Sequence, residues 1–195
     1  MPGHEDWYQL ITEGDFKFIP SKKAKNIPFD QAAQIAARSI YQRYENLHVC
    51  LSGGNDSKFV ADCFLNQGLD IGLIIIDCEM NREDVRRALD WCNGKGLKPS
   101  LFKISKEEYI RFAFEISWKR RIRYLWGFFP LIAEKFLPDA KLVTGYEDPF
   151  ECDESGILKN EIVIEQGAFL LDSSHPSAVF AYTPEILLAM VRDID

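Results

Sequence analysis

The feature that most restricts the fold of this chain is a nearly continuous apolar run over residues 71–77. A strand with one solvated face alternates apolar and polar residues, and this run does not alternate. It is therefore predicted to be buried on both faces, as strands of a helix-covered parallel sheet are. Parallel strands need long crossovers, which are usually helical, so helices should separate the strands along the chain.

Strand and helix patterns do alternate around this run. Further strands are predicted over 48–51, 100–104, 141–144 and 161–165. Helices are predicted over 29–44, 59–68, 81–94 and 105–136, with Asn81 as the cap of the third. A last helix should begin with Thr183 as its cap and Pro184 at its first position. The pattern predicts an α/β fold, doubly wound around a mostly parallel five-stranded sheet.

The first residues of the chain have a different pattern. Segments 7–12 and 16–19 flank the turn signal Glu13-Gly14-Asp15, which predicts a β-hairpin. We expect residues 1–28 to form an N-terminal hairpin extension and residues 29–195 to form one α/β domain. A chain of 195 residues with 47% hydrophobic residues is large enough for such a core.

Composition excludes several classes of protein. Five cysteines without a C-x-x-C pair argue against a disulfide scaffold or a structural zinc site. The apolar runs are too short to span a membrane, so no membrane partner is expected and the cytoplasm is the expected compartment. A net charge of −7 argues against a broad nucleic-acid surface, although Lys119, Arg120 and Arg121 form a local basic cluster. That cluster is either a solvated helix face or a contact for tRNA.

The segment Ser52–Ser57 lies between a predicted strand and a predicted helix. Its two glycines permit a sharp turn and a close approach of the backbone to a ligand. The following helix start offers unpaired N–H groups to a phosphate. No Gly-Lys-Ser/Thr occurs here, so this is not the loop of kinases and GTPases. Asp56 either coordinates Mg²⁺ or caps the helix.

The sequence Ser52-Gly53-Gly54-Asn55-Asp56-Ser57 resembles the S-G-G-x-D-S loop of the N-type ATP pyrophosphatases, also called the PP-loop or adenine nucleotide alpha hydrolase-like superfamily. The resemblance implies that these six residues bind the pyrophosphate of ATP and that Mg²⁺ is a cofactor. It also implies that the adenine lies against the second strand, near Ile76 and Asp77.

Residues 143–148 are similar to the [ST]-G-E-G-x-D-E segment of the synthetase domain of asparagine synthetases and β-lactam synthetases. The similarity implies that Thr144 and Gly145 contact the nucleotide. Tyr146 replaces the first acid of that segment, so either Glu147 or Asp148 is the implied second metal ligand beside Asp56.

Two further similarities to these synthetases concern chemistry. Glu115 lies 29 residues before Thr144, and Arg123 lies eight after Glu115, close to the placing of the family's catalytic glutamate and a following arginine. Segment 167–172 resembles R-x-P-F-L-D without its arginine and proline. Arg123 and Lys159 are the candidate catalytic cations, and Glu115 is the candidate base or a solvated helix acid.

The resemblance implies an enzyme that adenylates a small carboxylate or amide and ligates it to an amine. Pro2 stands where the family's glutaminase half has its cysteine, so the expected amine source is ammonia, another amine or a separate glutaminase. A homo-oligomer is expected. Two alternatives stay open: adenylation of a tRNA base, and a nucleotide-binding subunit without catalysis.

Overall fold

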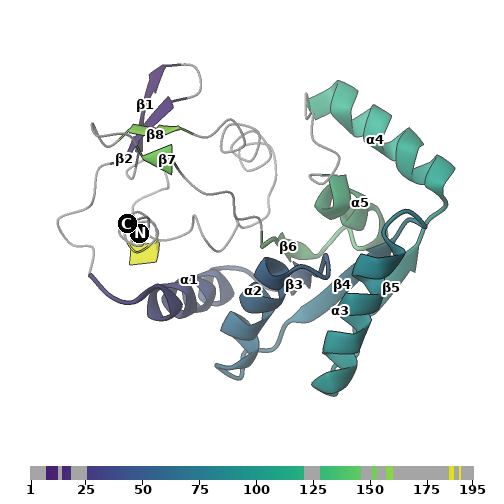
Figure 1. Cartoon of the computed structure of the whole chain (residues 1–195), viewed down its shortest axis with the longest axis horizontal. Helices are drawn as coiled ribbons and strands as arrows, with labels where there is room; N and C mark the ends of the chain where they lie inside the picture. Colours follow the sequence, from purple (N-terminus) through teal and green to yellow (C-terminus); the bar gives the residue numbers. More distant parts are fainter. Residues whose placement is uncertain are drawn as a thin grey trace.

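A parallel sheet forms the centre of the computed structural model, which describes residues 8–12, 15–18, 26–120, 128–145, 151–152, 157–159, 185–186 and 189 (Figure 1). Its strands are β3 (Leu47–Cys50), β4 (Gly72–Asp77), β5 (Ser100–Lys103) and β6 (Lys141–Val143). They lie in the order β5-β4-β3-β6, and every neighbouring pair is parallel. The chain therefore adds strands on one side of β3 and then crosses to its other side.

Helices cover both faces of this sheet. They are α1 (Phe29–Arg43), α2 (Asn55–Leu65), α3 (Arg82–Gly94), α4 (Lys106–Arg120) and α5 (Phe128–Phe136). Successive side chains of a strand point to opposite faces, so Leu73 and Ile75 pack with α1, α2 and α3, whereas Ile74 and Ile76 pack with α4 and α5. This arrangement confirms the doubly wound α/β prediction.

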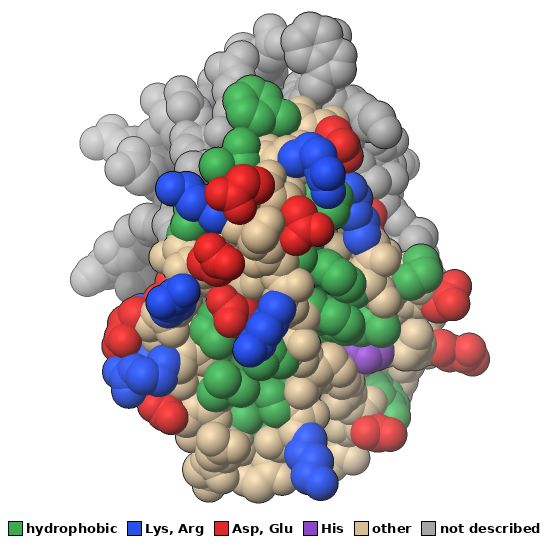
Figure 2. All heavy atoms as spheres, turned by 90° about the vertical axis from the view of Figure 1, so that its right-hand side faces the viewer, with side chains coloured by type: hydrophobic (Ala, Val, Ile, Leu, Met, Phe, Trp, Pro, Cys, Tyr) green, Lys and Arg blue, Asp and Glu red, His purple; other side chains and the backbone are tan. Residues whose placement is uncertain are grey.

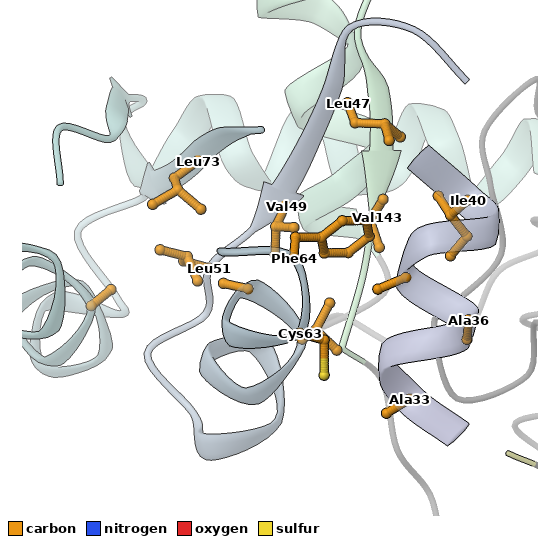
Figure 3. Packing of buried hydrophobic residues seen from close by; sticks show 14 of the residues in the cluster. Ala33, Ala36, Ile40, Leu47, Val49, Leu51, Cys63, Phe64, Leu73 and Val143 are labelled. Carbon is orange, nitrogen blue, oxygen red and sulfur yellow. The ribbon is translucent and has the colours of Figure 1, made fainter. Parts of the chain in front are cut away.

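The largest fully buried side chain is Phe64, which comes from α2. Figure 3 shows its ring beside Val49 of β3 and Val143 of β6, with the alanine face of α1 packed nearby. Small residues on α1 let that helix approach closely, and Ala32, Ala33, Ala36 and Ala37 are all fully buried. The core thus fixes α2, and with it the loop that begins α2, against the sheet.

The predicted N-terminal hairpin is present as β1 (Tyr8–Thr12) and β2 (Asp15–Phe18), and it does not stand alone. β2 pairs with β8 (Ile157–Lys159), which pairs with β7 (Glu151–Cys152), so a second, antiparallel sheet joins the N-terminal hairpin to residues 151–159. The hairpin pattern predicts the first pair of strands only, because its partner is more than a hundred residues away.

Several predicted strands and helices fall partly or wholly outside the residues that the structure describes. The parallel sheet has four described strands, and the fifth predicted strand, over 161–165, lies outside the described part of the chain. Thr183 and Pro184 lie outside it too, although Glu185, Ile186 and Ala189 are helical. The predicted helix over 105–136 is described as two helices, α4 and α5. Within the described residues, no helix combines the length and the hydropathy that crossing a bilayer requires.

Candidate nucleotide-binding site

The segment Ser52–Ser57 lies where the order of strands reverses. β3 is followed in sequence by β4 on one side, while its other neighbour, β6, comes last. In open α/β sheets, ligands bind at such switch points, beyond the carboxyl ends of the strands. The loop after β3 and the residues after β6 meet at this point, so the topology itself marks a ligand site.

Gly53 gives the loop its shape. Its φ is +86°, a left-handed conformation that side chains oppose. A Cβ at this position would overlap the backbone carbonyl oxygen of Asp84, in the first turn of α3. Glycine is therefore required twice, for the turn and for the close approach of α3.

Ser57 ties the loop together. Its side chain is 3% exposed, and its hydroxyl donates to the carbonyl oxygen of Gly54 at 3.2 Å. The same oxygen accepts the N–H of Ser52 at 3.2 Å and lies 3.2 Å from the Ser52 hydroxyl, which accepts the N–H of Gly54 at 3.3 Å. Ser57 was expected to face a phosphate, and the structure gives its hydroxyl internal partners.

Gly145 closes the loop from the side of β6. A Cβ there would stand 2.7 Å from the backbone N of Ser57, inside contact distance, so the chain after β6 lies directly on the first turn of α2. Thr144, before it, is 6% exposed. The structure thus brings the predicted residues Thr144 and Gly145 to the predicted loop.

The first turn of α2 carries unpaired donors. Helices leave their first N–H groups without internal partners. The N-cap residue, Gly54, has no side chain that could cap the helix. Within the described residues, the N–H groups of Asn55 and Asp56 have no hydrogen-bond partner. Both side chains are exposed. Such a helix start binds an anion through its N–H groups and its dipole.

The carboxyl end of β4 lies beside this loop. The backbone N–H of Leu51 continues the ladder by donating to the carbonyl oxygen of Ile74 at 2.8 Å. Two steps further along β4, Ile76 is buried, and Asp77 is half-buried with its carboxylate accepting the N–H of Glu79 at 3.1 Å. The two residues expected near adenine therefore lie at the same sheet edge as the loop.

The predicted catalytic residues are placed less completely. Glu115 is an exposed residue of α4, and its carboxylate accepts a hydrogen bond from the ammonium of Lys135 on α5 at 3.3 Å. Lys159 belongs to β8 of the antiparallel sheet, where it pairs with Asp15 of β2. Arg123 lies outside the described residues. Within the described residues, the one side-chain partner of Glu115 is Lys135, which does not belong to the loop.

A metal ion at this loop would have few protein ligands among the described residues. Asp56 offers one exposed carboxylate in the first turn of α2, while Glu147 and Asp148 lie outside the described residues. Within the described part of the chain, no three His, Cys, Asp or Glu side chains are grouped to hold a metal. One carboxylate beside phosphates suits Mg²⁺, which binds through one or two carboxylates and substrate phosphates rather than an all-protein cage.

Solved synthetase structures resemble part of this chain. An NH3-dependent NAD synthetase from Campylobacter jejuni subsp. jejuni NCTC 11168, in complex with nitrate, matches with 16% identity and a TM-score of 0.42 over 62% of this chain and 58% of its own. An NMN synthetase from Francisella tularensis matches with 14% identity and a TM-score of 0.39 over 62% of this chain and 56% of its own.

A third similar structure is a predicted subunit of tRNA methyltransferase from Methanocaldococcus jannaschii DSM, with 20% identity and a TM-score of 0.42, covering 75% of this chain and 74% of its own. The matched part of each synthetase is less than two thirds of its length. No protein-family model and no curated protein matches this chain.

The charges on one face of the molecule concern whether it could bind a nucleic acid. Figure 2 shows basic, acidic and apolar side chains intermixed on the face to the right in Figure 1. On α3, Arg86 pairs with Glu83 at 2.6 Å and with Asp90 at 3.1 Å, so the positive charge there is locally neutralised. The side chains of Lys119 and Arg120 are outside the described set.

Two residues near the loop make structural contacts that the sequence pattern does not predict. Asp84 contacts Gly53 through its backbone carbonyl, a group that every residue has, so no sequence signal marks it. Asn81 was expected to cap α3, but it makes no side-chain cap and its amide bonds to the end of β4 instead.

Proposed function

We propose that this chain binds ATP with its pyrophosphate on the loop Ser52–Ser57 and cleaves it between the α and β phosphates. One observation carries the proposal: the N–H groups of Asn55 and Asp56, which have no partner among the described residues, begin a helix at the switch point of the sheet. Gly53 and Gly145 hold this helix start between α3 and the end of β6. Backbone donors fixed in this way are suited to a polyphosphate.

The proposed reaction is adenylation followed by ligation. A carboxylate or amide oxygen of a small substrate attacks the α-phosphorus, a P–O bond to AMP forms, and pyrophosphate leaves. An amine then displaces AMP from the activated carbon. Asp56 would hold Mg²⁺, which neutralises charge on the phosphates; Glu147 or Asp148 is the proposed second ligand. Such transfer depends mainly on positioning and charge stabilisation.

Within this proposal Glu115 is the base that deprotonates the amine, and Arg123 and Lys159 are the cations that stabilise the departing phosphates. Glu115 already accepts a hydrogen bond from the ammonium of Lys135 at 3.3 Å, a contact that joins α4 to α5. The part of the proposal that the described residues support most directly is the binding of the triphosphate.

The test is release of pyrophosphate from ATP and Mg²⁺ in the presence of amino acids with ammonia, and separately in the presence of bulk tRNA. Release that depends on an amino acid and ammonia supports the synthetase activity, and release stimulated by tRNA assigns the chemistry to RNA instead. Binding of ATP without release from either substrate pool identifies a nucleotide-binding subunit.

Asp56→Asn tests the carboxylate, because it keeps the size of the side chain and removes its charge. We expect at least about a hundredfold slower pyrophosphate release. Glu45→Ala is the matched control, since Glu45 is an exposed acid before the amino end of β3, away from the loop. Unchanged turnover in Asp56→Asn would remove Asp56 from the mechanism.

A further inference from the structure

The end of β4 has hydrogen-bonding groups that no neighbouring strand takes. Toward β3, the carbonyl oxygen of Ile74 accepts the N–H of Leu51 at 2.8 Å. In a parallel sheet, the backbone groups of every second residue point to the same neighbour, so those of Ile76 also point toward β3. There, however, β3 has ended and the chain has turned into the loop. The carbonyl of Ile76 therefore points past the end of β3, on the side of the sheet where the loop begins.

The side chain of Asn81 fills this position. Its Nδ2 donates to the carbonyl oxygen of Ile76 at 2.8 Å, and its Oδ1 accepts the N–H of Cys78 at 3.0 Å. One planar amide thus satisfies an acceptor and a donor of the backbone at once. Buried backbone groups need such partners, so whatever replaces Asn81 here must supply the same donor and acceptor.

Adenine has the same pair of groups. Its exocyclic amino group is a donor, and a ring nitrogen beside it is an acceptor, on adjacent positions of one planar ring. The adenine of a nucleotide with its phosphates on the loop therefore matches the carbonyl of Ile76 and the N–H of Cys78 in the manner of the Asn81 amide. An adenine base at this position would compete with Asn81 for the same pair of backbone groups.

The turn that carries Asn81 is also strained. Glu79 has a φ of +65°, a left-handed conformation that costs a non-glycine residue energy. Its N–H is held by the carboxylate of Asp77 at 3.1 Å. Strain at such positions persists only where the surroundings enforce it, and it concentrates at ligand sites and switch regions.

We propose that Asn81 sets the affinity of the chain for the adenine base, by competing with it for the backbone groups of Ile76 and Cys78. This inference rests on the proposed function, in which the phosphates lie on the loop. ATP binds the form in which Asn81 has left β4, so its apparent affinity is lowered by the fraction of molecules in that form. Pyrophosphate, which has no base, does not require this change.

The test is calorimetric titration of the full chain with ATP and with inorganic pyrophosphate, for the wild type and for Asn81→Ser. Serine keeps a side-chain oxygen that is favourable at a helix start. Its side chain is too short to bond both the carbonyl of Ile76 and the N–H of Cys78. We expect the dissociation constant for ATP to fall by roughly three- to tenfold, the worth of one or two net hydrogen bonds. The constant for pyrophosphate should stay within about twofold.

Asn93→Ser is the matched control, because Asn93 is exposed near the other end of α3 and should leave both constants unchanged. If Asn81→Ser does not fold, nuclear magnetic resonance of the wild type replaces it: ATP should shift the side-chain amide signals of Asn81, and pyrophosphate should not. Unchanged or weaker binding of ATP to folded Asn81→Ser, or unshifted Asn81 signals, overturns the inference alone. A wild type that binds neither ligand overturns the proposed function and this inference together.

Discussion

Gly53 and Asp84 approach so closely that the backbone carbonyl of Asp84 takes the space of a side chain at position 53. The contact joins the loop after β3 to the first turn of α3, two segments that are separated along the chain by α2 and β4. The geometry of the loop therefore depends on how α3 is seated, and this dependence can be measured by substitution.

Gly53→Ala should destabilise the chain and weaken pyrophosphate binding together. The left-handed φ opposes a Cβ, and the carbonyl of Asp84 has no flexible atom that could yield. We expect a loss of about 2–4 kcal/mol in the free energy of unfolding, measured by urea denaturation. Gly94→Ala is the control, because a Cβ at Gly94 meets nothing within 4 Å. Equal stability of the two variants would contradict the role of the contact.

Gly145→Ala should weaken the binding of pyrophosphate while the chain still folds. The added methyl would stand 2.7 Å from the backbone N of Ser57, so the chain after β6 must move away from the first turn of α2. A displacement of this kind misaligns the loop, and we expect pyrophosphate affinity to fall about tenfold or more. Circular dichroism should show a folded protein. Retained affinity in that folded variant would show that the loop keeps its shape without Gly145.

Ser57→Ala should cost more stability than Ser52→Ala. The buried hydroxyl of Ser57 serves the carbonyl of Gly54 and the N–H of Ser52, and both groups lose their partner when it is removed. We expect about 1–3 kcal/mol for Ser57→Ala. The exposed hydroxyl of Ser52 has mainly the N–H of Gly54 as its partner, and water can replace it. Thermal melts of the two variants test this order, which a larger loss in Ser52→Ala would reverse.

Stability should fall at alkaline pH because of buried Cys63. Burial, and then the carboxylates of Asp62 and Asp30, raise the pKa of its thiol from 9.0 to about 12. Between these values the folded chain binds the proton and the unfolded chain does not, so the free energy of unfolding decreases as pH rises. The decrease is at most about 1.4 kcal/mol per pH unit, and the contribution is complete below pH 9.

Urea denaturation between about pH 8 and about pH 10.5 measures this slope. Cys63→Ala removes the thiol, so its free energy of unfolding should fall less steeply over the same range, whatever its stability at neutral pH. Parallel slopes for the wild type and the variant would assign the alkaline loss to other groups, such as Tyr109, whose pKa burial also raises to about 12.

Local signals in the sequence were enough for the parallel sheet. The apolar run over 71–77 became β4, and the pattern before the loop became β3, within a residue or two at each end. Such strands are buried on both faces, so their composition alone distinguishes them. The position of the loop followed from the same logic, because a strand end and a helix start bracket the two glycines.

Contacts between segments that are distant along the chain could not be predicted from the sequence. The pairing of β2 with β8 depends on residues that no short-range pattern connects. The helix-capping preference of asparagine indicated Asn81 as a cap, yet its amide bonds to β4, because the end of that strand has buried groups that need partners. Where backbone groups decide the geometry, as at Asp84, the identity of the side chain carries no information.

The ion pair between Lys95 and Asp62, at 2.7 Å, joins the far ends of α3 and α2, while Gly53 and Asp84 join their near ends. The two helices are thus connected at both their N-terminal and their C-terminal ends. Substitutions on the outer surface of α3 should therefore alter the conformation of the loop Ser52–Ser57 from a distance, while every residue of the loop itself stays unaltered.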